Sequence, residues 1–253
     1  MMRARPSSLH IVSHGLTHVG LVRRRNEDAF LDRPAHGPGL GLWAVADGMG
    51  GHEQGDYASA RIVAALGELK AAGEFGDVVQ SAAARLREVD GELRLRASRL
   101  GPGAVIASTV VVLLADPREF AVLWAGDSRV YRWRNNTLQQ LTVDHSRVQE
   151  LVDAGLLSVE AAAHHPQSHI VTRAIGAGRL EFGILREKLF AGDRFLLCSD
   201  GLTNMVSDAE IAREIAAASP RIAAERLCDR VLARGAVDNL TILIGTVEPA
   251  AQG

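Results

Sequence analysis

Acidic residues recur in this sequence where a run of apolar residues gives way to a turn. The stretch "LWAVADGMGG" rises through apolar residues to Asp47 and then breaks into glycines. Similar junctions, in "RRNEDAF", "WAGDSRVY", "LLCSDGL" and "VDNLTILI", contain Glu27, Asp28, Asp127, Asp200 and Asp238. One such acid is routine, because Asp favours turns and strand ends through local hydrogen bonds. Five such junctions in one chain suggest a shared purpose.

Carboxylates at strand ends can meet on one rim of a sheet structure. Converging carboxylates repel each other and raise their own pKa values unless a cation lies between them. Oxygen ligands with no accompanying Cys and no clear His suit Mg²⁺ or Mn²⁺. Gly48 follows Asp47, and without a side chain its backbone can come close enough for a carbonyl to join the ligands. The sequence therefore predicts a site for divalent cations.

Cysteine and histidine offer other chemistry, which we consider less favoured. Cys198 and Cys228 form no C-x-x-C pair and no metal-type spacing, so we expect two reduced, buried thiols. The segment "AHHPQSHIV" contains His164, His165 and His169, which raises the alternative of a zinc site. No Cys lies nearby, and adjacent histidines cannot easily chelate one ion. We interpret this segment instead as a mobile edge of the site that helps to select substrates.

The composition limits the classes of partner. The 253 residues are 47% hydrophobic, and 28 basic and 30 acidic residues give a net charge of −2. Without a basic block there is no reason to expect nucleic acid or an anionic membrane as partner. No apolar run is long enough to span a bilayer, and the N-terminus lacks the apolar region of a signal peptide. We expect a cytoplasmic protein.

The elements that must position the acids come in blocks. Short strands bounded by Gly, Asp or Asn are expected over 40–46, 105–115, 120–125, 130–133, 138–141, 194–198 and 240–247. Helices are expected over 56–70, 77–98 and 148–156, from the capping box at Ser207, and from Ser219-Pro220. Strand groups separated by helix blocks favour an α+β fold with sheets in the middle and helices outside. No repeat or linker divides the chain, so we expect a single domain over 1–253.

Eight segments appear in the order seen in the protein phosphatase 2C (PPM) family of metal-dependent Ser/Thr protein phosphatases. They are "VRRRNEDAF", "VADGMGGHEQG", "STVVVLL", "AGDSRVY", "LTVDHS", "TRAIG", "LLCSDGL" and "DNLTILI". The chain resembles the bacterial members over residues 14–247. The resemblance implies a four-layer αββα sandwich, with two central, mainly antiparallel β-sheets flanked by helices and a flap at 144–176.

The resemblance also implies roles for the acids. Asp47 would bridge two Mn²⁺ or Mg²⁺ ions, with the Gly48 carbonyl on one of them, and Asp200 and Asp238 would complete the other site. Glu27 would act through bound water, and Asp28 would hold that water shell from behind. Asp127, with Asp200, resembles the ligand of a third, weaker ion. Asn239 would support Asp238.

The implied reaction is attack on phosphorus by a hydroxide that bridges the two ions. The resemblance implies that Arg23 lies at the family's phosphate-binding position, and a guanidinium can contact two phosphate oxygens at once. Arg24 and Arg25 are interpreted as surface residues. Met49 stands where many eukaryotic members carry a His that acts as general acid. Metal-bound water is then our first candidate for the proton donor, with His52 as a bystander.

Three function classes can be compared on the sequence. We expect hydrolysis of phosphoserine and phosphothreonine in proteins, opposing a Ser/Thr kinase, by a monomer. Other phosphoester hydrolases are disfavoured, because there is no D-x-D motif, no P-loop lysine and no basic surface for a nuclease. A binding module with a dead site is disfavoured because Asp47, Asp200 and Asp238 are all present.

Overall fold

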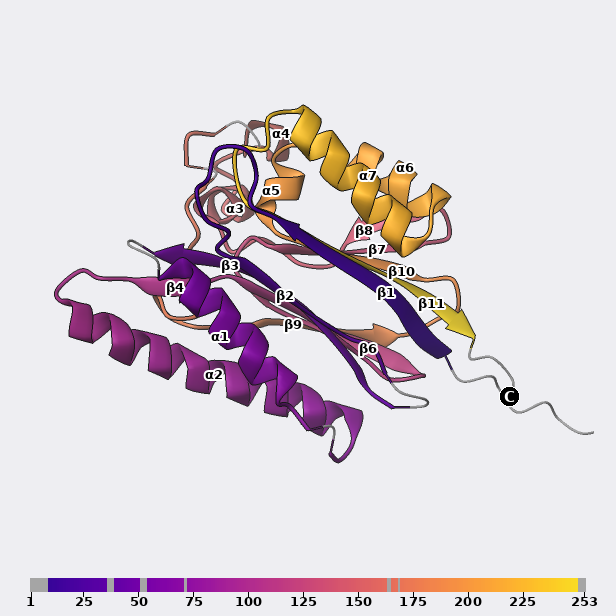
Figure 1. The fold of residues 1–253 in the computed structure, drawn as a ribbon, viewed down its shortest axis with the longest axis horizontal. Helices are drawn as coiled ribbons and strands as arrows, with labels where there is room; N and C mark the ends of the chain where they lie inside the picture. Colours follow the sequence, from indigo (N-terminus) through magenta and orange to yellow (C-terminus); the bar gives the residue numbers. More distant parts are fainter. Residues whose placement is uncertain are drawn as a thin grey trace, which may run out of the picture.

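The computed structural model describes residues 9–35, 39–50, 54–70, 72–162, 165–167 and 169–249. Two β-sheets lie face to face in the middle of the molecule, and helices cover both outer faces (Figure 1). Every strand ladder among the described residues is antiparallel. The predicted α+β sandwich of four layers is therefore confirmed.

One sheet contains five strands in the order β1-β11-β10-β7-β8. Their bounds are β1 Leu9–His18, β7 Arg129–Arg134, β8 Thr137–Gln140, β10 Arg194–Cys198 and β11 Leu240–Pro249. β1 and β11 pair along ten residues, from Leu9 opposite Pro249 to His18 opposite Leu240. This ladder joins two segments that lie more than 200 residues apart in the sequence, and it sets where the loops after β1 and before β11 meet.

The other sheet has the strand order β2-β3-β5-β6-β9, with β4 paired to the end of β3. The bounds are β2 Asp28–Arg33, β3 Gly41–Gly50, β4 Ile106–Ser108, β5 Val110–Ala115, β6 Glu119–Ala125 and β9 Gly183–Lys188. In β3, Leu42 and Ala44 face the helices, whereas Trp43 and Val45 face the opposite sheet. Both faces of this strand are buried, which explains its continuous apolar sequence.

The helices are α1 Gly55–Gly67, α2 Phe75–Leu100, α3 Arg147–Asp153, α4 Val159–Ala162, α5 Asp200–Thr203, α6 Asp208–Ala217 and α7 Pro220–Ala233. In Figure 1, α1 and α2 cover one outer face, and α6 and α7 cover the other. Ile62 of α1 and Leu86 of α2 are fully buried against the β3 sheet, as Ile211 of α6 and Leu227 of α7 are against the β11 sheet. None of the described helices is long and apolar enough to cross a membrane.

Several predicted boundaries were wrong, for local reasons. The strand expected to end at Ala46 continues to Gly50, because Gly48–Gly50 pairs with β4. The strand expected over 105–115 is interrupted at Thr109, whose backbone N–H instead donates to the Asp47 carbonyl oxygen. The flap helix stops at Asp153, and Leu156 is 74% exposed beyond Gly155, which has a φ of +68°.

Candidate functional site

The strand-end acids are brought to one end of the sandwich. Asp28 opens β2 and is directly opposite Asp47 in β3. Asp200 follows β10, Asp238 precedes β11, and Asp127 lies in the turn between β6 and β7. Asp47 experiences repulsion from all four of these other carboxylates. The structure thus gathers five acids that come from separate parts of the sequence.

The backbone at Asp47 is fixed by its neighbours. Thr109 Oγ1 accepts a hydrogen bond from Asp47 N–H at 3.2 Å, and Ser108 Oγ donates to the Asp47 carbonyl at 2.9 Å. Ser128 Oγ lies 2.7 Å from Thr109 Oγ1 and connects this group to the turn that carries Asp127. Buried hydroxyls therefore hold two of the acid-bearing segments in one arrangement.

Asp28 lies deepest of the acids, with only 8% of its surface exposed. Its Oδ2 accepts from Ser199 Oγ at 2.8 Å, and Ser199 Oγ also accepts from Thr241 N–H at 2.9 Å. Its Oδ1 is buried with no hydrogen-bond partner. A buried, unsatisfied carboxylate oxygen is costly, so a donor such as a bound water is needed there.

Asp28, Asp47, Asp127 and Asp200 carry raised pKa values for a common cause. Removal from solvent is the first cause, and the neighbouring carboxylates add to it. The pKa of Asp28 is raised to about 6 and that of Asp127 to about 7. The pKa of Asp47 lies well above its ordinary value, and that of Asp200 is raised as well. Such a cluster is electrostatically incomplete without a cation.

Glu27 lies where the loop after β1 meets the start of α1. Burial and repulsion by Asp56 raise its pKa, while Arg23 and the Gly55 N–H oppose that rise. Gly48 donates its N–H to the Glu27 carbonyl at 3.0 Å. A Cβ on Gly48 would lie 2.0 Å from the Gly55 carbonyl oxygen, so three backbone segments approach here as only glycine permits.

Arg23 is half-exposed, and its Nη2 donates to Asp238 Oδ2 at 2.7 Å. The guanidinium thus neutralises one of the predicted metal ligands, and this pairing raises the pKa of Arg23. Arg24 and Arg25 are exposed as predicted. The contact with Asp238 places Arg23 at the edge of the acid cluster, where an incoming anion would first meet a positive charge.

The residues fit divalent cations in donor type and in charge. In the described part of the chain, no three His, Cys, Asp or Glu side chains are arranged to hold a metal ion together as they stand. One contact occupies an oxygen that a cation would use, because Arg23 binds Asp238 Oδ2, whereas Asp47 and Asp200 repel each other. Five acids around one point, with Asp28 Oδ1 unsatisfied, match hard cations that take oxygen ligands.

The flap is joined to this end by polar contacts. Asp144 accepts three hydrogen bonds from Arg129, of 2.6 to 3.0 Å, and one from Gln140 at 3.0 Å. His145 Nδ1 accepts from the Gly126 N–H at 3.3 Å, and burial lowers the pKa of His145 to about 4. A cavity of about 660 Å³ lies between the flap and Asp127 and Asp200. The site therefore has room beside the acids.

Of the remaining sequence candidates, His169 lines the cavity beside Asp127 and Asp200, whereas the others do not line that cavity or lie outside the described residues. Cys198 is fully buried, and burial raises the pKa of its thiol to about 12. His165 Nδ1 accepts the backbone N–H of Gln167 at 3.2 Å, which is a local turn contact. Met49 is half-buried in β3. His52 and His164 lie outside the described residues.

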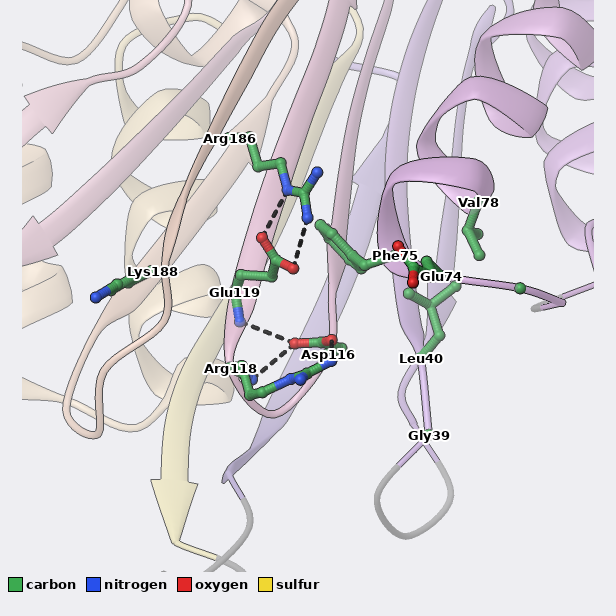
Figure 2. Close-up of a pocket in the computed structure, with 11 residues that line it drawn as sticks. Gly39, Leu40, Glu74, Phe75, Val78, Asp116, Arg118, Glu119, Arg186 and Lys188 are labelled. Atoms are coloured by element: carbon green, nitrogen blue, oxygen red, sulfur yellow. Dashed lines mark hydrogen bonds and ion pairs between the residues drawn. The ribbon is translucent and has the colours of Figure 1, made fainter.

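Another hollow, of about 860 Å³, lies at the opposite end of the sandwich, beside the start of α2 (Figure 2). Arg186 forms two hydrogen bonds with Glu119, at 2.6 and 2.7 Å, and Asp116 accepts the N–H groups of Arg118 and Glu119. Its acids are thus already paired, and it lies far from the strand-end carboxylates. This hollow is not part of the candidate metal site.

Sequence reasoning missed several supporting residues. Ser199, Thr109 and Ser128 are buried hydroxyls that bind or position the acids, and Asp56 lies near Glu27. Ser199 stands directly before Asp200, which is the one local signal that was available. The others act across elements and have no signature in the sequence around them.

Comparison with known proteins agrees with this geometry. The protein phosphatase 2C family model matches residues 22–235. A serine/threonine phosphatase, Stp, of Listeria welshimeri is 34% identical over 90% of this chain and 92% of its own length. The Mycobacterium tuberculosis phosphatase PstP is 34% identical over 90% of this chain, but the chain spans only 43% of that protein's length.

Solved structures show the same fold. PppA, a regulatory component of the type VI secretion system in Pseudomonas aeruginosa, has a TM-score of 0.86 and 39% identity, covering 95% of this chain and 99% of that one. The catalytic domain of PstP in complex with two manganese ions has a TM-score of 0.82 and 32% identity, covering 95% and 100%. The matched length and the shared architecture agree, and the chain belongs to the protein phosphatase 2C family.

Proposed function

We propose that this chain is a metal-dependent serine/threonine protein phosphatase that removes phosphate from phosphoserine and phosphothreonine in proteins and so reverses a Ser/Thr kinase. The observation that carries the proposal is the convergence of five strand-end aspartates, four of which repel the carboxylate of the fifth, Asp47, beside the half-exposed Arg23. The names of the relatives support the activity, and the manganese complex of PstP supports the metal. Residues 14–247 would form one catalytic domain, acting as a monomer.

We assign the metal ligands as the family resemblance implied. Asp47, the Gly48 carbonyl, Asp200 and Asp238 would hold two Mn²⁺ or Mg²⁺ ions, with Glu27 acting through water and Asp127 serving a third. When bound, these ions supply the Lewis acidity that ionises a water near neutral pH, and they neutralise phosphate charge. The raised pKa values of Asp47 and Asp200 are consistent with ligands that release protons as a cation binds.

The chain's own residues bind and orient the phosphate. Arg23 can release Asp238 and present its planar guanidinium to two phosphate oxygens. Asp28, anchored by Ser199 through one oxygen, keeps Oδ1 free to accept a hydrogen bond from a water and so to orient it. Met49 cannot donate a proton, so the departing Ser or Thr oxygen takes its proton from water in the site.

Phosphate release from a phosphothreonine peptide tests the proposal. We expect activity with Mn²⁺, loss of activity in EDTA, and recovery when Mn²⁺ is restored. Asp238→Asn should remove activity, whereas Asp229→Asn, which removes an exposed charge from α7, should not. Full activity of Asp238→Asn, or activity that survives EDTA, would refute the metal assignment.

The role of Arg23 needs its own control. Arg23→Ala should raise the KM about tenfold, which corresponds to one lost charge-assisted contact. Its exposed neighbour serves as the matched variant, and Arg24→Ala should leave the KM unchanged. Equal effects of the two substitutions would show that only the general charge of the loop matters.

A further inference from the structure

The loop between β1 and β2 carries two of the proposed functional residues without regular structure of its own. It spans residues 19–27, between His18 and Asp28, and contains Arg23 and Glu27. Its side chains at positions 21–25 are exposed, and Leu21 and Val22 are 63% and 65% exposed. Apolar packing by these side chains therefore cannot fix the loop, and hydrogen bonds must do so.

Asn239 supplies three of those bonds. This side chain lies between Asp238 and β11 and is 6% exposed. Its Oδ1 accepts the Glu27 N–H, and its Nδ2 donates to the carbonyls of Val19 and Arg25, all at 2.8 Å. One N–H and two carbonyls fix the orientation of the amide without ambiguity. A single side chain thus binds the first residue of the loop, Val19, and two residues close to its end, Arg25 and Glu27.

Other contacts also join the loop to the residues just before Asn239. Leu21 N–H donates to the Ala236 carbonyl at 2.8 Å, and Arg23 binds Asp238. Gly20 has a φ of +82°, and a Cβ there would lie 2.3 Å from the Asp238 carbonyl oxygen. The loop therefore lies directly against residues 236–239, and Asn239 is the only described side chain that binds it at three points.

We propose that Asn239 is a positioning residue, which sets where Arg23 and Glu27 lie relative to the metal ligand Asp238. It contacts neither phosphate nor, in our assignment, a metal; it acts through the backbone of the loop. The proposal rests on the proposed function, because it concerns how the phosphate-binding arginine is placed. This role goes beyond support of Asp238, which is what the sequence predicted.

A double-mutant cycle tests whether Asn239 acts through Arg23. Asn239→Ala should raise the KM for a phosphothreonine peptide and the inhibition constant of inorganic phosphate about tenfold, with a smaller change in kcat. Because Arg23 would already be misplaced, adding Arg23→Ala should cause little further loss. Effects that multiply in the double variant would overturn the proposal.

Hydrogen exchange gives a readout that does not require activity. In Asn239→Ala, and in the milder Asn239→Ser, the amides of residues 20–27 should exchange at least about tenfold faster, while those of β10 stay protected. Ile244→Val, a buried change on the same strand, is the matched control: it should lower the Tm without altering loop exchange or KM. Unchanged loop exchange in both Asn239 variants would also overturn the proposal.

The two proposals can fail separately. If the wild-type chain with Mn²⁺ released no phosphate, the proposed function would fall, whereas the exchange experiment would still decide whether Asn239 holds the loop. If the wild type is active and both Asn239 variants keep normal KM values, the positioning role alone is wrong.

Discussion

The two ends of the sandwich hold their acids in opposite ways. At the end with Asp28, Asp47 and Asp200, carboxylates face one another and raise each other's pKa values. At the other end, Arg186 binds Glu119, and Arg134 binds Asp193 through two bonds of 2.6 Å (Figure 2 shows the first pair). The described carboxylates at one end thus repel one another, whereas Glu119 and Asp193 at the other end are each bound by an arginine.

The largest expected effect comes from removing a charge at the unpaired end. Asp47→Asn should lower kcat/KM with Mn²⁺ by more than about 100-fold, because a proposed bridging ligand is lost. The Tm of the metal-free protein should stay the same or rise, since one repelling carboxylate disappears. Phosphate release and thermal unfolding of the same preparation check both parts, and a large fall in Tm would contradict the comparison.

The opposite result is expected for a paired acid at the other end. Asp193 is 1% exposed, and it also accepts the Phe190 N–H at 2.9 Å. Asp193→Asn should destabilise the fold by about 3 kcal/mol, because it removes the buried carboxylate that binds Arg134 through two hydrogen bonds. The kcat/KM of the folded fraction should stay at the wild-type value. Urea unfolding followed by assays below the transition measures this, and a loss of kcat/KM would show that the two ends are coupled.

The pH dependence of stability should also distinguish the two ends, because His145 lies at the end that carries the strand-end acids. Burial and Arg173 lower the pKa of His145 to about 4, so the folded state favours the neutral ring. The stability that this preference provides is full above pH 6.5 and is lost as the pH falls toward 4. Because the ring is partly exposed, we expect a loss of about 1–2 kcal/mol between these limits. The His145→Asn variant should lose less stability than the wild type over the same pH range. If urea unfolding gave both proteins the same dependence of the free energy of unfolding on pH, this expectation would be contradicted.

The smallest effect is expected from an exposed pair beside the second hollow. Glu119→Gln removes the partner of Arg186, an ion pair that solvent screens. The Tm should fall by less than about 3 °C, and less still in 0.5 M salt. A larger fall would mean that surface pairing contributes as much to stability as the buried Asp193 pair.

Much of the fold could be predicted from local patterns. The strand over 194–198 and the capping box at Ser207 match the structure, because each is defined by its own residues. β1, β2 and β9 were missed. β1 and β9 are edge strands whose sequences include Ser, His, Arg or Glu, and they form through pairing with distant partners such as β11 and β6. Such pairing leaves little trace in the strand itself.

In the candidate site, too, local patterns could be predicted and contacts between distant segments could not. The acids were predictable because Asp and Gly at strand ends form a recurring local pattern. The contacts of Asn239 with the loop after β1 were not predictable, since they join residues more than 200 positions apart. Nor could the sequence show that Arg23 binds Asp238. Pairing across the sheet decides these contacts, whereas the pattern of the sequence only supplies the partners.

The long ladder between β1 and β11 has a consequence for synthesis. Arg23 and Glu27 emerge early from a ribosome, whereas Asp238 and Asn239 belong to the last strand of the sheet. Until that strand has left the ribosome and paired with β1, the loop around Arg23 lacks its hydrogen bonds with Ala236, Asp238 and Asn239. A partly made chain should therefore be inert toward phosphoproteins, and activity should begin only when synthesis of this region is finished.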